Sequence, residues 1–166
     1  MKHTRLILAA VILACVAGPA RAETVVRMFL LTQDGPGAVA GTIHAADAQG
    51  GLRLTPRLKG LPPGRHAFHV NRDGDCAAGI ADGRKVPGGA AGPVYQGKPP
   101  ATTIGPEGSG RRRGDLPPLV VGADGVARAA VLAQGLRLSE IAGRSLLIDG
   151  GEGSAPGAVA CGVIPK

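Results

Sequence analysis

The chain has 166 residues, which is enough for one domain with a hydrophobic core, and a formal net charge of +7. With no tryptophan, one tyrosine and two phenylalanines, it offers no aromatic platform for stacking bases, which argues against nucleic-acid binding. A mildly basic surface more often supports solubility or attracts small anions.

Residues 1–22 have the features of a secretory signal peptide. A basic start is followed by an aliphatic run at residues 6–14, and the segment ends in a small-x-small pattern at Ala22. The run is about half as long as a bilayer span, so we expect no transmembrane segment once the leader is removed. A weak lipoprotein pattern before Cys15 leaves lipidation at that cysteine as an open alternative.

Cleavage leaves a mature domain of residues 23–166, which we expect in the periplasm or outside the cell. Its formal charge is +4, because the leader takes with it three of the basic residues behind the total of +7. Two cysteines, Cys76 and Cys161, remain, and an even pair in an oxidising compartment predicts a disulfide rather than two buried thiols. A crosslink over such a long loop stabilises a fold by about 2–4 kcal/mol.

Apolar and alternating runs separated by turns predict eight strands and no helix longer than one turn. Pro56, within the third run, indicates a sheet edge or a bulge. Residues 72–118 show no periodicity, and a stretch of this kind in a compact domain is usually functional or disordered. Antiparallel strands at regular spacing predict an all-β sandwich or closed barrel. The expected strands are residues 24–31, 39–45, 51–58, 65–71, 119–121, 126–132, 145–148 and 158–164.

The run at residues 65–71 holds two of the four histidines of the chain. Its period of two places His66 on one face of a strand, and His69 together with Asn71 on the other face. A strand that presents His69 and Asn71 at the mouth of a long loop is typical of the first half of a metal site.

Several motifs along the chain fall in the order found in one known family. The sequence GRHAFHV at residues 64–70 precedes Cys76, GPEG at 105–108, GDLP at 114–117 and ACGVI at 160–164. In this order the motifs resemble the copper/zinc superoxide dismutases of the bacterial periplasm, over nearly the whole mature chain. The resemblance implies an eight-stranded antiparallel Greek-key β-barrel, in which a disulfide between Cys76 and Cys161 pins one long loop.

That family holds copper with four histidines, one of which is shared with zinc, and the resemblance carries over only one of them. The first copper position matches His69. The other three are taken by Asn71, by Pro93 in place of the bridging histidine, and by Asp149. Imidazoles suit both oxidation states of a cycling copper, so we expect the family's redox site to be degenerate.

The zinc positions are depleted in the same way. Thr103 and either Arg111 or Arg112 stand where histidines are expected, and Asp115 matches the remaining zinc ligand. The family's active-site arginine falls on Ala158.

A count of histidines supports this comparison without any alignment. The mature chain contains only His44, His66 and His69, whereas a dinuclear site of the family type requires six histidine ligands. His66 matches a non-ligand histidine that ties the strand to neighbouring loops, and His44 is interpreted as a surface or packing residue.

We therefore expect an exported, superoxide dismutase-like protein that has lost dismutase activity and binds no metal cofactor. It would act as a non-catalytic binding or structural module for an unidentified protein or small ligand, in an oligomeric state left open. The alternative is a copper-dependent superoxide dismutase or copper-binding protein with a site rebuilt around His69, Asn71 and Asp149.

The arginine run at residues 111–113 has two interpretations. In the first, a guanidinium pairs with Asp115 or Asp149 and takes over the loop-ordering role of zinc. In the second, the three arginines form a solvated face that contributes little to stability.

Overall fold

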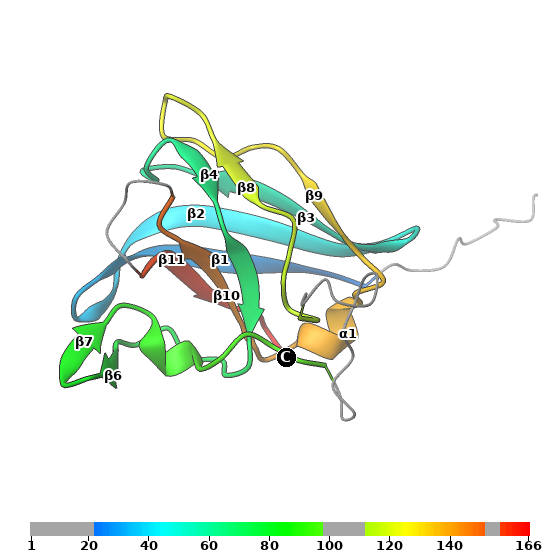
Figure 1. The fold of residues 1–166 in the computed structure, drawn as a ribbon. Helices are drawn as coiled ribbons and strands as arrows, with labels where there is room; N and C mark the ends of the chain where they lie inside the picture. The colour runs from blue at the N-terminus through cyan, green and yellow to red at the C-terminus, as the bar shows by residue number, and fades with distance from the viewer. Residues whose placement is uncertain (1–21, 98–111, 152–156) are drawn as a thin grey trace, which may run out of the picture.

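A curled antiparallel sheet forms the wall of the molecule in the computed structural model, which describes residues 22–97, 112–151 and 157–166 (Figure 1). Within those residues, helix is limited to a 3-10 turn at Gly89–Ala91 and the single α-helical turn α1 at Leu138–Ile141. No described helix is long and apolar enough to cross a membrane. The strands are β1 (Glu23–Thr32), β2 (Gly35–Ala48), β3 (Gly51–Leu58), β4 (Gly64–His66), β5 (Phe68–Asn71), β6 (Gly79–Ala81), β7 (Arg84–Val86), β8 (Leu119–Val121), β9 (Val131–Gln134), β10 (Ser145–Asp149) and β11 (Ala158–Val163).

The sheet closes into a barrel through a short second ribbon. Its described strands are seven, in the order β5-β10-β11-β1-β2-β3-β9, so the first and last strands of the chain are neighbours. On the other side β4 pairs with β8, and the segment after β8 returns to β3 through the pair Leu58↔Ala127. With β4 and β5 counted as two halves of one strand, the described wall has eight strands, and the Greek-key barrel expected from the sequence is confirmed.

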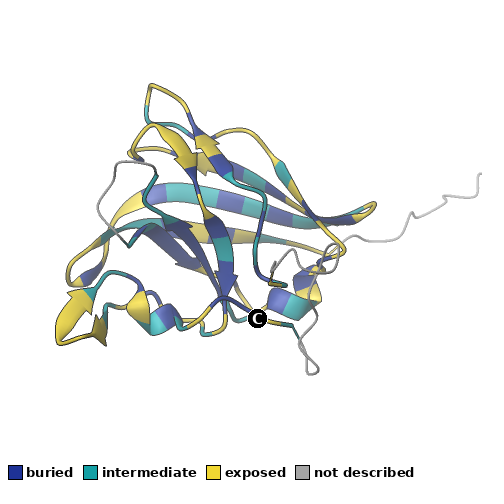
Figure 2. Ribbon diagram, viewed as in Figure 1, coloured by how far each residue is buried: buried dark blue, intermediate teal, exposed yellow. Residues whose placement is uncertain are grey.

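Buried and exposed residues alternate along the strands, so that apolar side chains fill the inside of the barrel. In β1, Val26 and Met28 are fully buried while Val25 is 46% exposed, and in β3 Leu52 and Leu54 are fully buried. Figure 2 shows the same alternation of buried and exposed segments along the wall. The core is almost entirely aliphatic, with Phe68 as its largest fully buried side chain, as the low aromatic content predicts.

The disulfide expected between Cys76 and Cys161 is present, with a Cα–Cα distance of 5.7 Å. Cys161 lies in β11 and is fully buried, in a small apolar cluster with Ala91, Leu147 and Ala158. The bridge therefore ties the loop that follows β5 to the last strand of the barrel.

The region that lacks periodicity contains an element that the sequence analysis missed. β6 and β7 form a hairpin whose turn residues Asp82 and Gly83 have φ angles of 50° and 72°. An Asp-Gly pair is a strong signal for a two-residue hairpin turn, but the flanking strands are only three residues long each and carry no alternation. Residues 1–21 of the predicted signal peptide, Cys15 among them, lie outside the described residues.

Candidate functional site

The candidate site lies on β5, where the barrel wall meets the loops. His69 and Asn71 pair with Leu147 and Ser145 of β10 on one side. On the other side His69 forms an isolated bridge with Asp115, and Asn71 forms one with Val94. Phe68 and Val70 point into the core, so the alternate residues His69 and Asn71 face these loops.

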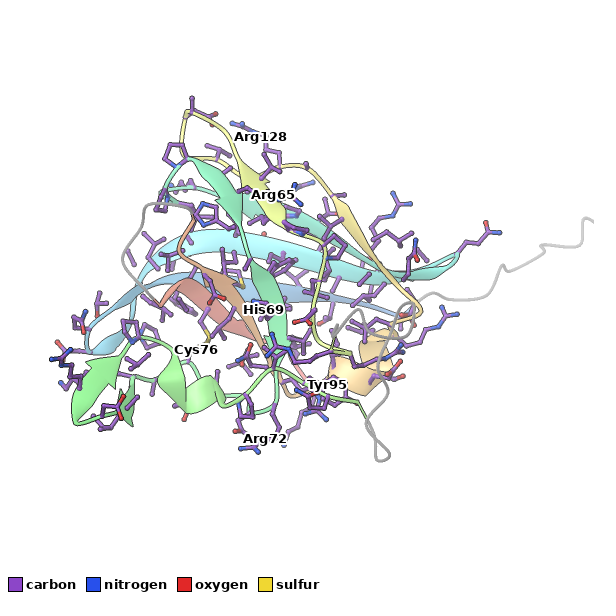
Figure 3. The ribbon with its side chains drawn as sticks, viewed as in Figure 1. Arg65, His69, Arg72, Cys76, Tyr95 and Arg128 are labelled. Atoms are coloured by element: carbon purple, nitrogen blue, oxygen red, sulfur yellow. A yellow bond between two sulfur atoms is a disulfide. The ribbon has the colours of Figure 1, made fainter. Side chains whose placement is uncertain are left out.

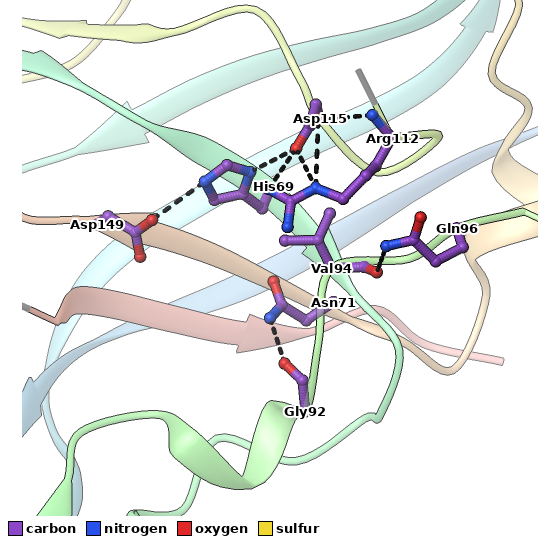
Figure 4. Close-up of polar contacts among 8 residues, drawn as sticks. All are labelled: His69, Asn71, Gly92, Val94, Gln96, Arg112, Asp115 and Asp149. Atoms are coloured by element: carbon purple, nitrogen blue, oxygen red, sulfur yellow. Dashed lines mark hydrogen bonds and ion pairs between the residues drawn. The ribbon is translucent and has the colours of Figure 1, made fainter. Parts of the chain in front are cut away.

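His69 sits between two carboxylates (Figure 4). Its Nε2 lies 3.0 Å from Asp149 Oδ2, and its Nδ1 lies 3.3 Å from Asp115 Oδ1. The His69 side chain is 17% exposed, so both contacts are partly shielded from water. Asp149 occupies the last position of β10, and Asp115 follows the long loop, so the contacts join three separate parts of the chain to one ring.

A guanidinium holds Asp115 from its other side. Arg112 donates from Nη2 and Nε to Asp115 Oδ1 at 3.0 and 3.2 Å, and its backbone N–H donates to Oδ2 at 2.7 Å. Burial disfavours the ionised carboxylate, but the hydrogen bonds and charge of Arg112 outweigh it and lower the pKa of Asp115 below 3.8. Asp115 is therefore an anion already supplied with a cation.

Asn71 joins β5 to the loop that contains Gly92. Its Nδ2 donates to the Gly92 carbonyl at 2.7 Å, and the residue is only 7% exposed. Its Oδ1, like Nδ1 of His69, is buried without a hydrogen-bond partner among the described residues. For His69 Nδ1 this agrees with the 3.3 Å ion-pair distance to Asp115, because the oxygen is close but poorly directed for a hydrogen bond.

Two other positions implied by the resemblance, those of Pro93 and Ala158, contribute no donor side chain. Pro93 accepts a backbone hydrogen bond from Arg72 at 2.9 Å through its carbonyl, and its ring carries no donor atom. Ala158 lies in β11 and is 9% exposed. Thr103 and Arg111 lie outside the described residues.

His66 fixes the backbone around the site. It is fully buried, and its Nδ1 and Nε2 lie 2.8 and 2.7 Å from the carbonyl oxygens of Asp149 and Pro62. The ring thus links the end of β10 to the turn before β4. Its contact with the Asp149 carbonyl fixes the backbone position from which the Asp149 side chain extends.

A second arginine–carboxylate pair lies beside the first, and the sequence analysis did not anticipate it. Arg113 donates to both carboxylate oxygens of Glu140 in α1, at 2.6 and 3.1 Å, and to the Gly135 carbonyl. The guanidinium of Arg144 lies 3.9 Å from the centre of the Tyr95 ring, in the region that Figure 3 shows below His69. The sequence held only a weak signal for Arg113, namely its place next to Arg112.

The residues present do not fit a copper or a zinc ion. One imidazole, one amide oxygen and one carboxylate make a poor copper site and an incomplete zinc site. Arg112 places its positive guanidinium on Asp115, which opposes a second cation there. Among the described residues no group of three or more histidine, cysteine, aspartate or glutamate side chains converges in a way that could hold a metal ion.

Comparison with known proteins bears on the origin of this arrangement. The family model described as copper/zinc superoxide dismutase matches residues 39–164. The chain is 43% identical to superoxide dismutase [Cu-Zn] 2 of Salmonella typhimurium, over 87% of this chain and 83% of that protein. The solved Cu/Zn superoxide dismutase from Brucella abortus shares 39% identity and a TM-score of 0.75, over 86% of this chain and 99% of that one. A solved double mutant of a SOD-like protein from Bacillus subtilis, 23% identical with a TM-score of 0.65 over 86% of this chain and 97% of that one, shares the fold.

Proposed function

This chain belongs to the copper/zinc superoxide dismutase family, and we propose that it has kept the barrel of that family without its dismutase activity. In this proposal the protein is a non-catalytic binding or structural module, and its partner is a protein or a small ligand. The observation that carries the proposal is the state of His69, the one family copper ligand that remains, which faces a carboxylate from each ring nitrogen.

Two features of His69 support loss of the reaction. Dismutation by this family requires a copper that alternates between two oxidation states, and such a site needs several imidazoles. Here the strand offers one imidazole, and a metal would have to displace Asp149 or Asp115 from it. A shared fold does not preserve an activity when the residues that perform it have been replaced.

We also propose that the protein works outside the cytoplasm. The leader pattern at residues 1–22 predicts export, and the Cys76–Cys161 bridge is the kind of crosslink that persists in an oxidising compartment. Mass spectrometry of the chain recovered from a periplasmic or culture fraction tests this, with a mature N-terminus at Glu23 as the expected result.

The decisive experiment measures metal content and superoxide turnover on the same sample. The mature chain is expressed in the periplasm, purified without chelators, and compared before and after loading with copper and zinc. The Brucella abortus enzyme serves as the positive control. We expect less than one-tenth of an equivalent of copper and no turnover above that of free copper with serum albumin. Stoichiometric copper with turnover would refute the proposal.

A second function, that of a copper-binding protein or copper-dependent dismutase with a rebuilt site, is favoured by one specific observation. Among the described residues Oδ1 of Asn71 has no hydrogen-bond partner, and Nδ1 of His69 has only the 3.3 Å ion-pair contact with Asp115, so both atoms are potential ligands for a metal in a rebuilt site that also includes Asp149. If such a site binds copper, His69→Gln and Asn71→Ala should each lower the copper stoichiometry. A His44→Gln control, on the partly exposed His44 ring that contacts Glu23, should leave it unchanged. Copper that is lost equally in all three variants, or in none, is adventitious.

A further inference from the structure

The backbone pairing between β3 and residues 127–134 is interrupted in its middle. β3 pairs with β9 from Gly51↔Gln134 to Leu54↔Val131, and pairing resumes at Leu58↔Ala127. The two stretches share one register, because four residues separate the pairs on each strand. The break is therefore an opened section of a continuous ladder, centred where Pro56 stands opposite Ala129.

Pro56 explains the opening. In the register set by the Leu58–Ala127 pair, whose N–H groups each donate to the other carbonyl, the nitrogen of Pro56 points towards Ala129. Proline has no N–H to donate, and a proline within a sheet is confined to an edge or an irregularity. No backbone hydrogen bond joins Pro56 to Ala129, both of which are described.

The opened section is a groove of about 570 Å³ on the outside of the barrel. The surface exposed in the groove is mainly apolar and includes the partly exposed Val126, whereas the side chains of Pro56 and Leu58 are buried and face the barrel interior. Three cationic side chains, Arg57, Lys59 and Arg128, line the same groove. A volume of this size is typical of small-molecule sites, which combine an apolar lining with a few polar groups.

The charges around the groove are not balanced. Arg57 lies opposite Arg128 in the register, and like charges at directly opposed positions destabilise a sheet. Among the ion pairs of the described residues, Arg57 and Lys59 have no carboxylate partner, and Arg128 contacts only Asp124, at 3.0 Å through Nη1. The groove thus concentrates positive charge beside apolar surface, and an anion would relieve the repulsion.

We propose that this groove binds an aliphatic carboxylate, with the chain along Val126 and the backbone of the opened section and the carboxylate between Arg57 and Arg128. Arginine suits this role because its planar fork matches a carboxylate. Figure 3 shows Arg128 at the opposite end of the molecule from Arg72 and Tyr95, and away from His69. The proposal is therefore independent of the loss of dismutase activity, and either can fail alone.

The test uses the intact mature protein and decanoate below its micellar concentration. Amide chemical shifts and calorimetry are recorded during titration. Acetate carries the charge without the chain, and decyltrimethylammonium carries the chain with the opposite charge. We expect saturable shifts at Thr55, Arg57, Arg128 and Ala129 with decanoate alone. Equal shifts with acetate would indicate an adventitious ion only. Equal shifts with decyltrimethylammonium would indicate nonspecific binding of the apolar chain. Either result overturns the proposal.

Three variants separate binding from folding. Arg57→Gln and Arg128→Gln should each raise the Kd for decanoate about fivefold, and the double variant more than tenfold. Arg53→Gln is the matched control, because Arg53 lies exposed on the same strand opposite Leu132 and does not line the groove. Arg57→Gln should melt no lower than the parent, since it removes a repulsion. An unchanged Kd in the double variant, or the same loss in Arg53→Gln, would overturn the proposal.

Discussion

Substitution of Asp115 by alanine tests whether a guanidinium has taken over the loop-ordering role of zinc. The change removes the two Arg112 guanidinium contacts to Oδ1 and the backbone contact to Oδ2. The ion pair is half exposed on the arginine side, so it contributes about 0.5–1 kcal/mol. The backbone hydrogen bond adds about 1 kcal/mol.

The expected loss is therefore about 1.5–2 kcal/mol in the free energy of unfolding, or a fall of roughly 3–8 °C in Tm for a domain of this size. Differential scanning calorimetry at neutral pH measures it. The matched control is Asp34→Asn, which breaks a shorter but far more exposed pair with Lys85 and should change Tm by less than about 1 °C. A double-mutant cycle with Arg112→Gln should recover a coupling of about 0.5–1 kcal/mol.

The same pair has a defined pH dependence. The pKa of Asp115 is lower in the folded protein than the ordinary value of 3.8, so the folded state favours the ionised carboxylate. The stabilisation is fully present above the unfolded pKa and is lost as the pH falls through the folded pKa. The difference in stability between the parent and Asp115→Ala should therefore stay constant from about pH 5 to 8 and shrink below about pH 4.

Two results would refute this reasoning. One is an Asp115→Ala variant that melts with the parent protein, because the pair would then be part of a solvated face. The other is a parent protein whose Tm falls in EDTA and recovers with zinc, because a metal and not Arg112 would then order the loop.

Three further predictions concern other contacts. Replacement of both disulfide cysteines by serine should lower the stability by about 4 kcal/mol, estimated for the sequence separation of 85 residues and measured by urea unfolding; a loss under about 1 kcal/mol would contradict it. Arg113→Ala should cost about 1–2 kcal/mol and release α1 to proteolysis, because it removes a partly buried two-point contact with Glu140; an unchanged cleavage pattern would argue against this role. Gly41→Ala should cost more than about 2 kcal/mol in thermal unfolding, because φ is 138° and the new Cβ would overlap the carbonyl oxygen of Arg57. Gly64→Ala, with φ 124° and open space, should cost less, and equal losses would show that strain alone matters.

The barrel could be predicted from the sequence because its evidence is local and repeated. Alternation within runs such as β3 specifies which face is buried, and the motif order around His66 specifies the family. The β6–β7 hairpin was missed because three-residue strands are too short to show a period. Its Asp82-Gly83 turn was the signal that remained.

The candidate site could be predicted only as a set of positions. The sequence identified His69, Asp115 and Asp149, but it could not show that both carboxylates contact the same ring, since this depends on how β10 and the loop before β8 meet β5. It also could not choose between the arginines of the run. Arg112 lies three residues before Asp115, and a turn in the backbone brings its N–H and guanidinium to one carboxylate.

The opening at Pro56 also has a consequence for self-association. A closed barrel has no free edge, but an opened ladder exposes backbone groups to which a strand from another molecule could add. Here the missing N–H of Pro56 removes one of the hydrogen bonds that such a strand would need, and Arg57 and Arg128 repel a second copy of the same charged segment. The chain therefore carries, at this gap in its described wall, the residues that proteins use to keep exposed strands from aggregating.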